Sequence, residues 1–205
     1  MSQISSGVRA IFSRPAFYDA FQALMGARRG RRELVERFIR PEPRSRVLDL
    51  GCGTAEILDF LPHTVEYWGY DSSVNYISSA RTRFGSRGHF RCAEVSRATL
   101  EGMPRFDVVL MIGLLHHLDD AAGRNALGLA RDALAREGRL VTVDPCLAEG
   151  QNPVARCLIK LDRGQSVRDA CGYRALATTC FPEVSGTLLH RRWIPYTHWI
   201  MECSV

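Results

Sequence analysis

The sequence predicts an α/β fold with a doubly wound, mostly parallel sheet of seven strands, the last of them antiparallel. Three observations support this prediction. Short apolar runs alternate with amphipathic stretches along most of the chain, which is typical of successive βα units. The apolar run 106–112 is dense enough for a central strand buried on both faces. Two β-like runs near the C-terminus, joined by Arg-Arg-Trp-Ile-Pro, predict an antiparallel hairpin.

The N-terminal segment is predicted to be helical. Phe17 and Phe21 begin an apolar stripe at helical spacing, and Pro41 and Pro43 end a second helix. The expected divisions of the chain are an N-terminal helical segment at 1–43 and a main domain at 44–205 that contains a helical insert at 146–181.

Strands and helices alternate through the main domain. The predicted strands cover residues 46–50, 65–70, 89–92, 106–112, 140–143, 184–190 and 196–203. The predicted helices cover 54–61, 74–84 after a cap at Ser72 or Ser73, a stretch from Asp119 or Asp120 to Gly138, one opening at Asn152 and one around 169–179.

Composition indicates an ordinary globular protein. The chain has 205 residues, of which 46% are hydrophobic and 24% charged, as expected for a single domain. No apolar run approaches the roughly 20 residues that a membrane-spanning helix needs. The first residues lack the basic and apolar layout of a secretory signal, so we expect a cytoplasmic location. The cysteines form no C-x-x-C pair, and we therefore expect neither a disulfide framework nor a metal site.

The net charge of +5 comes almost entirely from arginine, because Lys160 is the only lysine. The densest run, Arg28-Arg29-Gly30-Arg31-Arg32, could bind anions, but such runs more often form a solvated helix face. Nucleic acid is therefore not an expected partner.

Residues with ligand-binding chemistry follow three of the predicted strands. In open α/β sheets, ligands bind outside the carboxyl ends of the strands. Gly51 and Gly53 form a tight turn after the first strand, where a ligand can approach the backbone closely. Asp71 closes the second strand and could accept hydrogen bonds from a ribose, while Glu94 follows the third strand, near an adenine edge. These positions predict a nucleoside pocket.

The residue at position 56 argues against a dinucleotide in this pocket. The dinucleotide fingerprint G-x-G-x-x-G requires a third glycine where this chain has Glu56. A carboxylate there would repel a pyrophosphate at the start of the helix, but it is compatible with a positively charged sulfonium nucleoside that carries no phosphate.

Four motifs in order resemble those of class I S-adenosylmethionine-dependent methyltransferases, specifically the small-molecule branch that includes the type 11 and ubiquinone–menaquinone methyltransferase-like proteins. The motifs are Val47–Thr54, Tyr67–Ser73, Phe106–Asp119 with its Leu-Leu-His-His-Leu-Asp sequence, and Ala135–Leu140. The resemblance implies a Rossmann-like methyltransferase domain, S-adenosylmethionine as cofactor and a lid formed by the N-terminal helices.

The resemblance also implies a set of cofactor-binding residues. The glycine turn would pass under the methionine part, Asp71 would hold the ribose, and Ile112 would flank the sulfonium. Asp49 would brace the glycine turn and reach the cofactor's amino group. Ala55 departs from the family, which often has a third glycine at this position. The complete set is Asp49, Gly51, Cys52, Gly53, Asp71, Ser72, Glu94, Val95 and Ile112.

Two adjacent histidines follow the fourth strand, beside the expected methyl group. Methyl transfer mainly requires alignment, and a hydroxyl acceptor also benefits from a general base. His116 and His117 are the candidate bases, with His117 preferred. The alternative is an imidazole that packs in the loop and bonds Asp119 or the backbone.

The acceptor site is expected between the N-terminal helices and the insert. Aromatic residues there could equally belong to the core. The candidates for acceptor contact are Tyr18, Arg163, Tyr173, Tyr196 and His198.

Three functions fit the sequence. The first is methyl transfer to an oxygen, nitrogen or carbon of a small molecule by a monomer or homodimer. The second is an RNA or protein methyltransferase that uses the arginine-rich surface, although no Asn-Pro-Pro-Tyr signature or paired catalytic cysteine motif is present. The third is a non-catalytic S-adenosylmethionine-binding protein, which the intact glycine turn and Asp71 disfavour.

Overall fold

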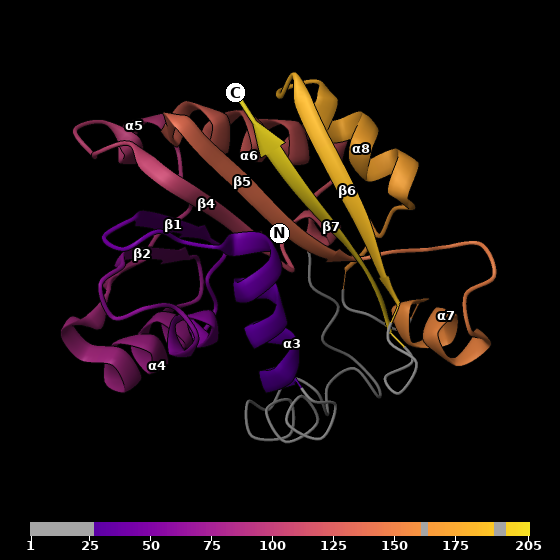
Figure 1. The fold of residues 1–205 in the computed structure, drawn as a ribbon, viewed down its shortest axis with the longest axis horizontal. Helices are drawn as coiled ribbons and strands as arrows, with labels where there is room; N and C mark the ends of the chain where they lie inside the picture. Colours follow the sequence, from indigo (N-terminus) through magenta and orange to yellow (C-terminus); the bar gives the residue numbers. More distant parts are fainter. Residues whose placement is uncertain (1–26, 161–163, 191–195) are drawn as a thin grey trace.

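A computed structural model of the chain describes residues 27–160, 164–190 and 196–205, and it contains a seven-stranded sheet in the order β3-β2-β1-β4-β5-β7-β6 (Figure 1). The first five strands are parallel to one another, and β7 pairs antiparallel with both β5 and β6. The predicted α/β sheet with an antiparallel last strand is therefore confirmed. The strands are β1 (Arg46–Leu50), β2 (Glu66–Asp71), β3 (His89–Cys92), β4 (Phe106–Ile112), β5 (Leu134–Pro145), β6 (Glu183–His190) and β7 (Thr197–Ser204).

Helices cover both faces of the sheet, which gives two hydrophobic layers. One layer is formed with α6 and α8, and the other with α3, the π-helical turn after it, and α4 (Figure 1). The helices are α3 (Ala27–Leu34), α4 (Val74–Phe84), α5 (Arg97–Leu100), α6 (Asp120–Ala133), α7 (Pro153–Lys160) and α8 (Ala170–Thr178). The short turns are η1 (Val35–Ile39), η2 (Glu56–Asp59), η3 (Gly85–Arg87) and η4 (Leu115–His117).

Polar side chains cap the helices where the sequence predicts caps. Ser73 accepts a hydrogen bond from the N–H of Tyr76 at the start of α4. Asp119 accepts from the N–H of Ala122 at the start of α6. Each cap satisfies a backbone donor that the helix leaves open.

The predicted helix at 54–61 is wrong, because only the short turn η2 forms there. Ala55 has φ 57° and ψ 31°, the left-handed conformation, so a right-handed helix cannot continue through it from the glycine turn.

The predicted helix end at Gly138 is also wrong, since α6 stops at Ala133 and β5 begins at the next residue. A β-carbon on Gly138 would lie 2.7 Å from the carbonyl oxygen of Phe106. The register between β4 and β5 shifts between Phe106 and Val108. Gly138 therefore allows a close approach between strands at an irregularity, rather than capping a helix.

The segment before β1 packs into the same core as the sheet. Leu34, Val35, Phe38 and Ile39 are buried in one cluster with residues of β1 and β2. The N-terminal aromatic stripe, including Phe17 and Tyr18, lies outside the described residues.

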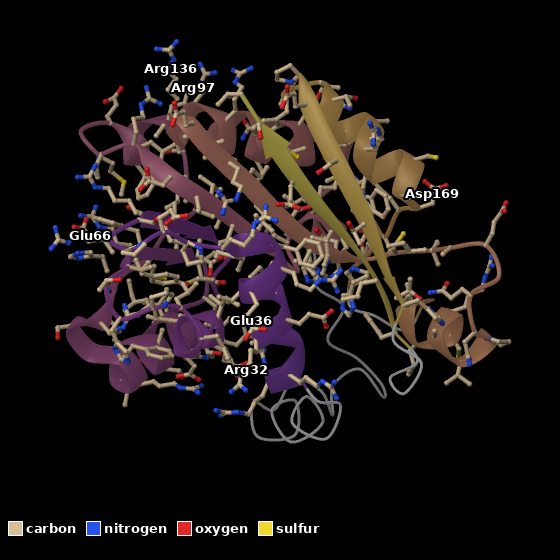
Figure 2. All side chains as sticks on the ribbon, viewed as in Figure 1. Arg32, Glu36, Glu66, Arg97, Arg136 and Asp169 are labelled. Atoms are coloured by element: carbon tan, nitrogen blue, oxygen red, sulfur yellow. The ribbon has the colours of Figure 1, made fainter. Side chains whose placement is uncertain are left out.

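The arginine run on α3 is partly engaged with the protein. Arg31 forms an ion pair with Glu56, and the guanidinium of Arg28 lies over the ring of Phe60. Arg29 and Arg32 are exposed, and Figure 2 shows Arg32 on α3. No helix in the described part of the chain combines the length and apolar character needed to cross a membrane.

Candidate functional site

The candidate site lies at the carboxyl ends of the parallel strands. β1 lies between β2 and β4, and the direction of strand order reverses there. Such a switch point opens a crevice that is the usual ligand site in this type of sheet. The glycine turn follows β1 at this edge, and the two histidines follow β4.

The glycine turn is tied to the end of β2 through its backbone. The N–H groups of Gly51 and Cys52 both donate to the carbonyl of Tyr70, at 2.8 and 3.0 Å. Gly51 has φ 75°, and a β-carbon there would lie 3.0 Å from Leu114 on the loop after β4. Glycine at position 51 therefore permits both the left-handed backbone and the close approach to the loop after β4 that carries His116 and His117 (the histidine loop).

Asp71 connects the glycine turn to the start of α4. One carboxylate oxygen accepts from the N–H of Gly53 at 3.0 Å, and the other accepts from the N–H of Ser73 at 2.8 Å. Each oxygen has two lone pairs, so both can still accept a hydrogen bond from a ligand hydroxyl. Ser72, which lies between Asp71 and Ser73 in the sequence, is exposed.

Asp49 is buried on β1 with one oxygen bonded and one open. The hydroxyl of Tyr67 donates to Oδ2 at 2.7 Å, whereas Oδ1 has no hydrogen-bond partner among the described residues. Burial raises the pKa of Asp49 from 3.8 to about 7, with the Tyr67 hydrogen bond opposing and Asp71 adding to the rise. The N–H groups of residues 51–53 donate to Tyr70 and Asp71, and none of these bonds reaches Asp49.

Cys52 points from the turn onto β2. A β-carbon on Gly69 would lie 2.8 Å from its sulfur, so only glycine at position 69 leaves room for this side chain. Burial, followed by the charges of Asp49 and Asp71, raises the pKa of the Cys52 thiol. Cys52 therefore stays protonated and acts as a packing residue.

The remaining predicted cofactor residues lie at neighbouring strand ends. The N–H of Ala93 donates to the carbonyl of Asp71, which places the chain after β3 beside Asp71. Glu94 is exposed, Val95 is half-buried against the α6 layer, and Ile112 is half-buried at the end of β4. The predicted residues thus lie at the carboxyl ends of four strands, β1 to β4, at one edge of the sheet.

His116 and Asp144 form a buried pair across the ends of β4 and β5. His116 Nδ1 lies 2.8 Å from Oδ1 of Asp144, and the backbone N–H of His116 donates to the same oxygen at 3.1 Å. His116 is 5% exposed and Asp144 is 1% exposed. Burial raises the pKa of Asp144, while the hydrogen bonds and charge of His116 oppose this rise.

The other candidate base, His117, is half-buried, with its ring centroid 4.0 Å from that of His116. Asp144, which directly follows the predicted strand at 140–143, was not among the predicted site residues. One signal could have identified this residue. β4 and β5 are neighbouring parallel strands, so a carboxylate at the end of β5 lies close to the histidines that follow β4.

Three acceptor candidates surround Pro145, at the end of β5. The hydroxyl of Tyr173 donates to the Pro145 carbonyl at 2.9 Å, and this side chain is fully buried. The rings of Tyr196 and His198 stand 5.0 Å apart, and His198 is the register partner of Pro145. Tyr173 thus has a buried packing position beside the end of β5. Tyr18 and Arg163 lie outside the described residues.

Glu56 is engaged by the N-terminal helix. Its carboxylate pairs with Arg31 of α3, and both side chains are largely covered. The Glu56 carboxylate, paired with Arg31, thus lies next to the glycine turn, at the place where a pyrophosphate would approach in a dinucleotide-binding protein. In the part of the chain that the structure describes, no group of three His, Cys, Asp or Glu side chains could hold a metal ion.

Comparisons with known proteins agree with this geometry. Residues 48–140 match a family described as a methyltransferase domain. An uncharacterized protein of Synechococcus sp. is 34% identical over 86 residues, which cover 38% of this chain and 20% of that protein.

Solved structures share the fold across nearly the whole chain. The S-adenosylmethionine-dependent methyltransferase SibL, in its apo form, matches with a TM-score of 0.72 at 18% identity, over 97% of this chain and 60% of SibL. Human N-acetylserotonin methyltransferase, solved in complex with S-adenosylmethionine, matches with a TM-score of 0.67 at 16% identity, over 96% of this chain and 58% of that enzyme.

The chain thus spans a fifth of the curated relative and about three fifths of these two enzymes. The family match covers less than half of the chain, in the part that carries the glycine turn, Asp71 and the two histidines. Residues 48–140 match a methyltransferase domain family, and the chain shares the fold of these S-adenosylmethionine-dependent methyltransferases, in agreement with the resemblance in its motifs.

Proposed function

We propose that this protein transfers a methyl group from S-adenosylmethionine to a hydroxyl group of a small molecule. The observation that carries the proposal is the buried His116–Asp144 pair at the end of β4 and β5. A hydroxyl acceptor benefits from a group that removes its proton, and a histidine held by a carboxylate is suited to this task.

The residues at the edge of the sheet fit the cofactor. The open Oδ1 of Asp49 is a buried acceptor that suits the positively charged amino group of S-adenosylmethionine. Asp71 retains lone pairs for the ribose hydroxyls while it holds the N–H groups of Gly53 and Ser73. The cofactor supplies a methyl carbon that its sulfonium already activates, so the chain must mainly align and deprotonate the acceptor.

His116 is the proposed base, in place of the preference for His117. With Nδ1–H donating to Asp144, Nε2 of His116 carries the lone pair and accepts the proton of the hydroxyl. Asp144 fixes this tautomer and stabilises the imidazolium that forms. We further propose that α3, in the described part of the predicted lid at 1–43, borders the site, consistent with the ion pair between Arg31 and Glu56; residues 1–26 lie outside the described residues.

Two measurements test the proposal. Calorimetric titration should show binding of S-adenosylmethionine and S-adenosylhomocysteine, and labelled methyl groups should appear on phenols or other hydroxyl compounds from a metabolite panel. Absence of cofactor binding would overturn the proposal entirely. Methylation of amines, total RNA or protein, with hydroxyl compounds untouched, would overturn the hydroxyl acceptor while retaining a methyltransferase.

A further inference from the structure

Arg168, just before α8, has its whole guanidinium engaged with the histidine loop. Nη1 donates to the carbonyl of Leu115 at 3.1 Å, and Nη2 donates to the carbonyl of Leu118 at 2.9 Å. Nε and Nη2 both donate to Oδ1 of Asp120, at 3.1 and 2.7 Å, and Nη1 also reaches the carbonyl of Ser166. The two loop carbonyls lie on either side of His116 and His117.

This set of contacts uses the full hydrogen-bonding capacity of the side chain. A guanidinium has five N–H donors, and the described contacts of Arg168 number five. The Arg168 side chain is 13% exposed. Binding a carboxylate or phosphate of the acceptor would require it to release the loop, so an anion-binding role is disfavoured.

Tyr173, one turn into α8, holds the other strand end. Its hydroxyl donates to the carbonyl of Pro145, the residue directly after Asp144. Burial, then the nearby charge of Asp144, raises the pKa of Tyr173, so the hydroxyl keeps the proton that it donates. The guanidinium carbon of Arg168 lies 5.7 Å from the centre of the Tyr173 ring, which links the two contacts.

The backbone before Arg168 closes over His116. The N–H of Ser166 donates to the carbonyl of His116 at 2.9 Å, and the N–H of Leu147 donates to the carbonyl of Arg168 at 3.2 Å. A β-carbon on Gly164 would lie 2.1 Å from Cδ2 of the His116 ring. Figure 2 shows Asp169 at the start of α8, where this segment arrives, whereas Arg97 and Arg136 lie at the opposite edge of the sheet.

We propose that Arg168, together with Tyr173, is a positioning residue that fixes His116 and Asp144 relative to each other. Arg168 holds the carbonyls that flank the histidines, and Tyr173 holds the carbonyl that follows the aspartate. The inference rests on the proposed function for its effect on catalysis. The effect arises because a displacement of about 1 Å at a reacting group can lower a rate roughly 100-fold.

Kinetics of Arg168→Met, Arg168→Lys and Tyr173→Phe test the positioning role. We expect Arg168→Met to lower kcat by about 10- to 100-fold, with KM for the acceptor and Kd for the cofactor within about twofold of the parent. Arg168→Lys should recover part of this loss, since an ammonium can still bond one carbonyl. The acidic limb of the kcat profile should move to lower pH, because a loosened Asp144 stabilises the imidazolium less.

Two variants serve as matched controls. Arg174→Met removes an exposed arginine from the same helix, and Asp120→Asn removes the carboxylate partner but leaves both carbonyl contacts. Both should stay within about threefold of the parent in kcat. The proposal is overturned if Arg168→Met behaves like Arg174→Met, if its main effect is a higher KM for anionic acceptors, or if kcat falls with the pH profile unmoved.

A second readout needs no turnover. In the full chain labelled with ¹⁵N-histidine, the Nδ1–H signal of His116, identified by its loss in His116→Gln, should shift in Arg168→Met but not in Arg174→Met. An unshifted signal overturns the positioning role even if methyl transfer is present. A shifted signal in a chain that methylates nothing supports the positioning role and refutes the proposed function.

Discussion

The two halves of the site are built in different ways. On the cofactor side, backbone N–H groups and carboxylates join residues 18 positions apart, as in Gly53 with Asp71 and Tyr67 with Asp49. On the histidine side, side chains join residues 28 to 53 positions apart, from His116 with Asp144 to Arg168 with Leu115. The cofactor side also leaves an acceptor open at Asp49, whereas the guanidinium of Arg168 is fully engaged. The cofactor side thus offers an unpaired carboxylate oxygen to a positively charged group, whereas the contacts on the histidine side fix the position of the His116 ring.

The largest expected effect separates the two histidines. His116→Ala should lower kcat for a hydroxyl acceptor by about 10²- to 10⁴-fold, because the base and its carboxylate support are lost together. Cofactor affinity should stay within about threefold of the parent. His117→Ala is the matched control and should retain most of the activity. Equal losses in both variants, or a greater loss in His117→Ala, would return the base to His117.

The next effect concerns the open carboxylate on the cofactor side. Folding raises the pKa of Asp49 from 3.8 to about 7. At pH values between these two, the carboxyl group keeps its proton in the folded state but has released it in the unfolded state. Without cofactor, stability should therefore fall as pH rises from about 4 to 7. Asp49→Asn should remove this component, on the order of 1–4 kcal/mol in the free energy of unfolding.

Chemical denaturation of both proteins at pH 5, 6.5 and 8 measures this difference. Glu36→Gln, at an exposed position in η1 that Figure 2 labels, should follow the pH curve of the parent. In the parent, cofactor affinity should rise through the same pH range, since an ionised Asp49 favours a cationic ligand. Parallel pH curves for the parent and Asp49→Asn would contradict the assignment.

Asp71 should have a smaller effect, confined to the cofactor side. Asp71→Ala removes two hydrogen bonds to backbone N–H groups and the predicted ribose contact, so Kd for S-adenosylmethionine should rise by about 10- to 100-fold. Calorimetry gives this value directly. Glu66→Gln, an acidic residue at the other end of β2, is the control and should bind like the parent. An unchanged Kd in Asp71→Ala would remove Asp71 from the binding set.

The smallest effect is expected at Ala55. Glycine there relieves a left-handed alanine by about 1 kcal/mol but loses a buried methyl group and adds freedom to the unfolded chain. Ala55→Gly should thus change the free energy of unfolding by less than about 1 kcal/mol, measured in urea. Gly53→Ala meets no atoms within 4 Å but has φ 56°, so it should destabilise by about 1 kcal/mol. A larger gain in Ala55→Gly would mean that the turn stores more strain.

The same contrast explains what the sequence could predict. The strands, the caps at Ser73 and Asp119, and the cluster of Gly51, Gly53 and Asp71 at one edge follow from local pattern and strand direction. The helix after the glycine turn could not be excluded in advance, because alanine normally favours helix and the left-handed backbone at Ala55 is imposed by the loop around it.

The pairing of Asp144 and the loop contacts of Arg168 could not be predicted for a different reason. Their partners lie far away in the chain, and nothing in the local sequence distinguishes Arg168 from the many other arginines. The preference between His116 and His117 likewise depended on which imidazole meets a carboxylate from the next strand. Such pairings are set by packing and register, which local periodicity does not encode.

The ion pair between Arg31 and Glu56 links the cofactor turn to the N-terminal helix thermodynamically. Glu56 lies three residues beyond Gly53, and α3 continues into η1, whose residues share the core of β1. We therefore expect a ligand that orders the turn to reduce local opening of α3 as well. On this expectation, slower exchange of the α3 amide hydrogens would report cofactor binding at the neighbouring turn.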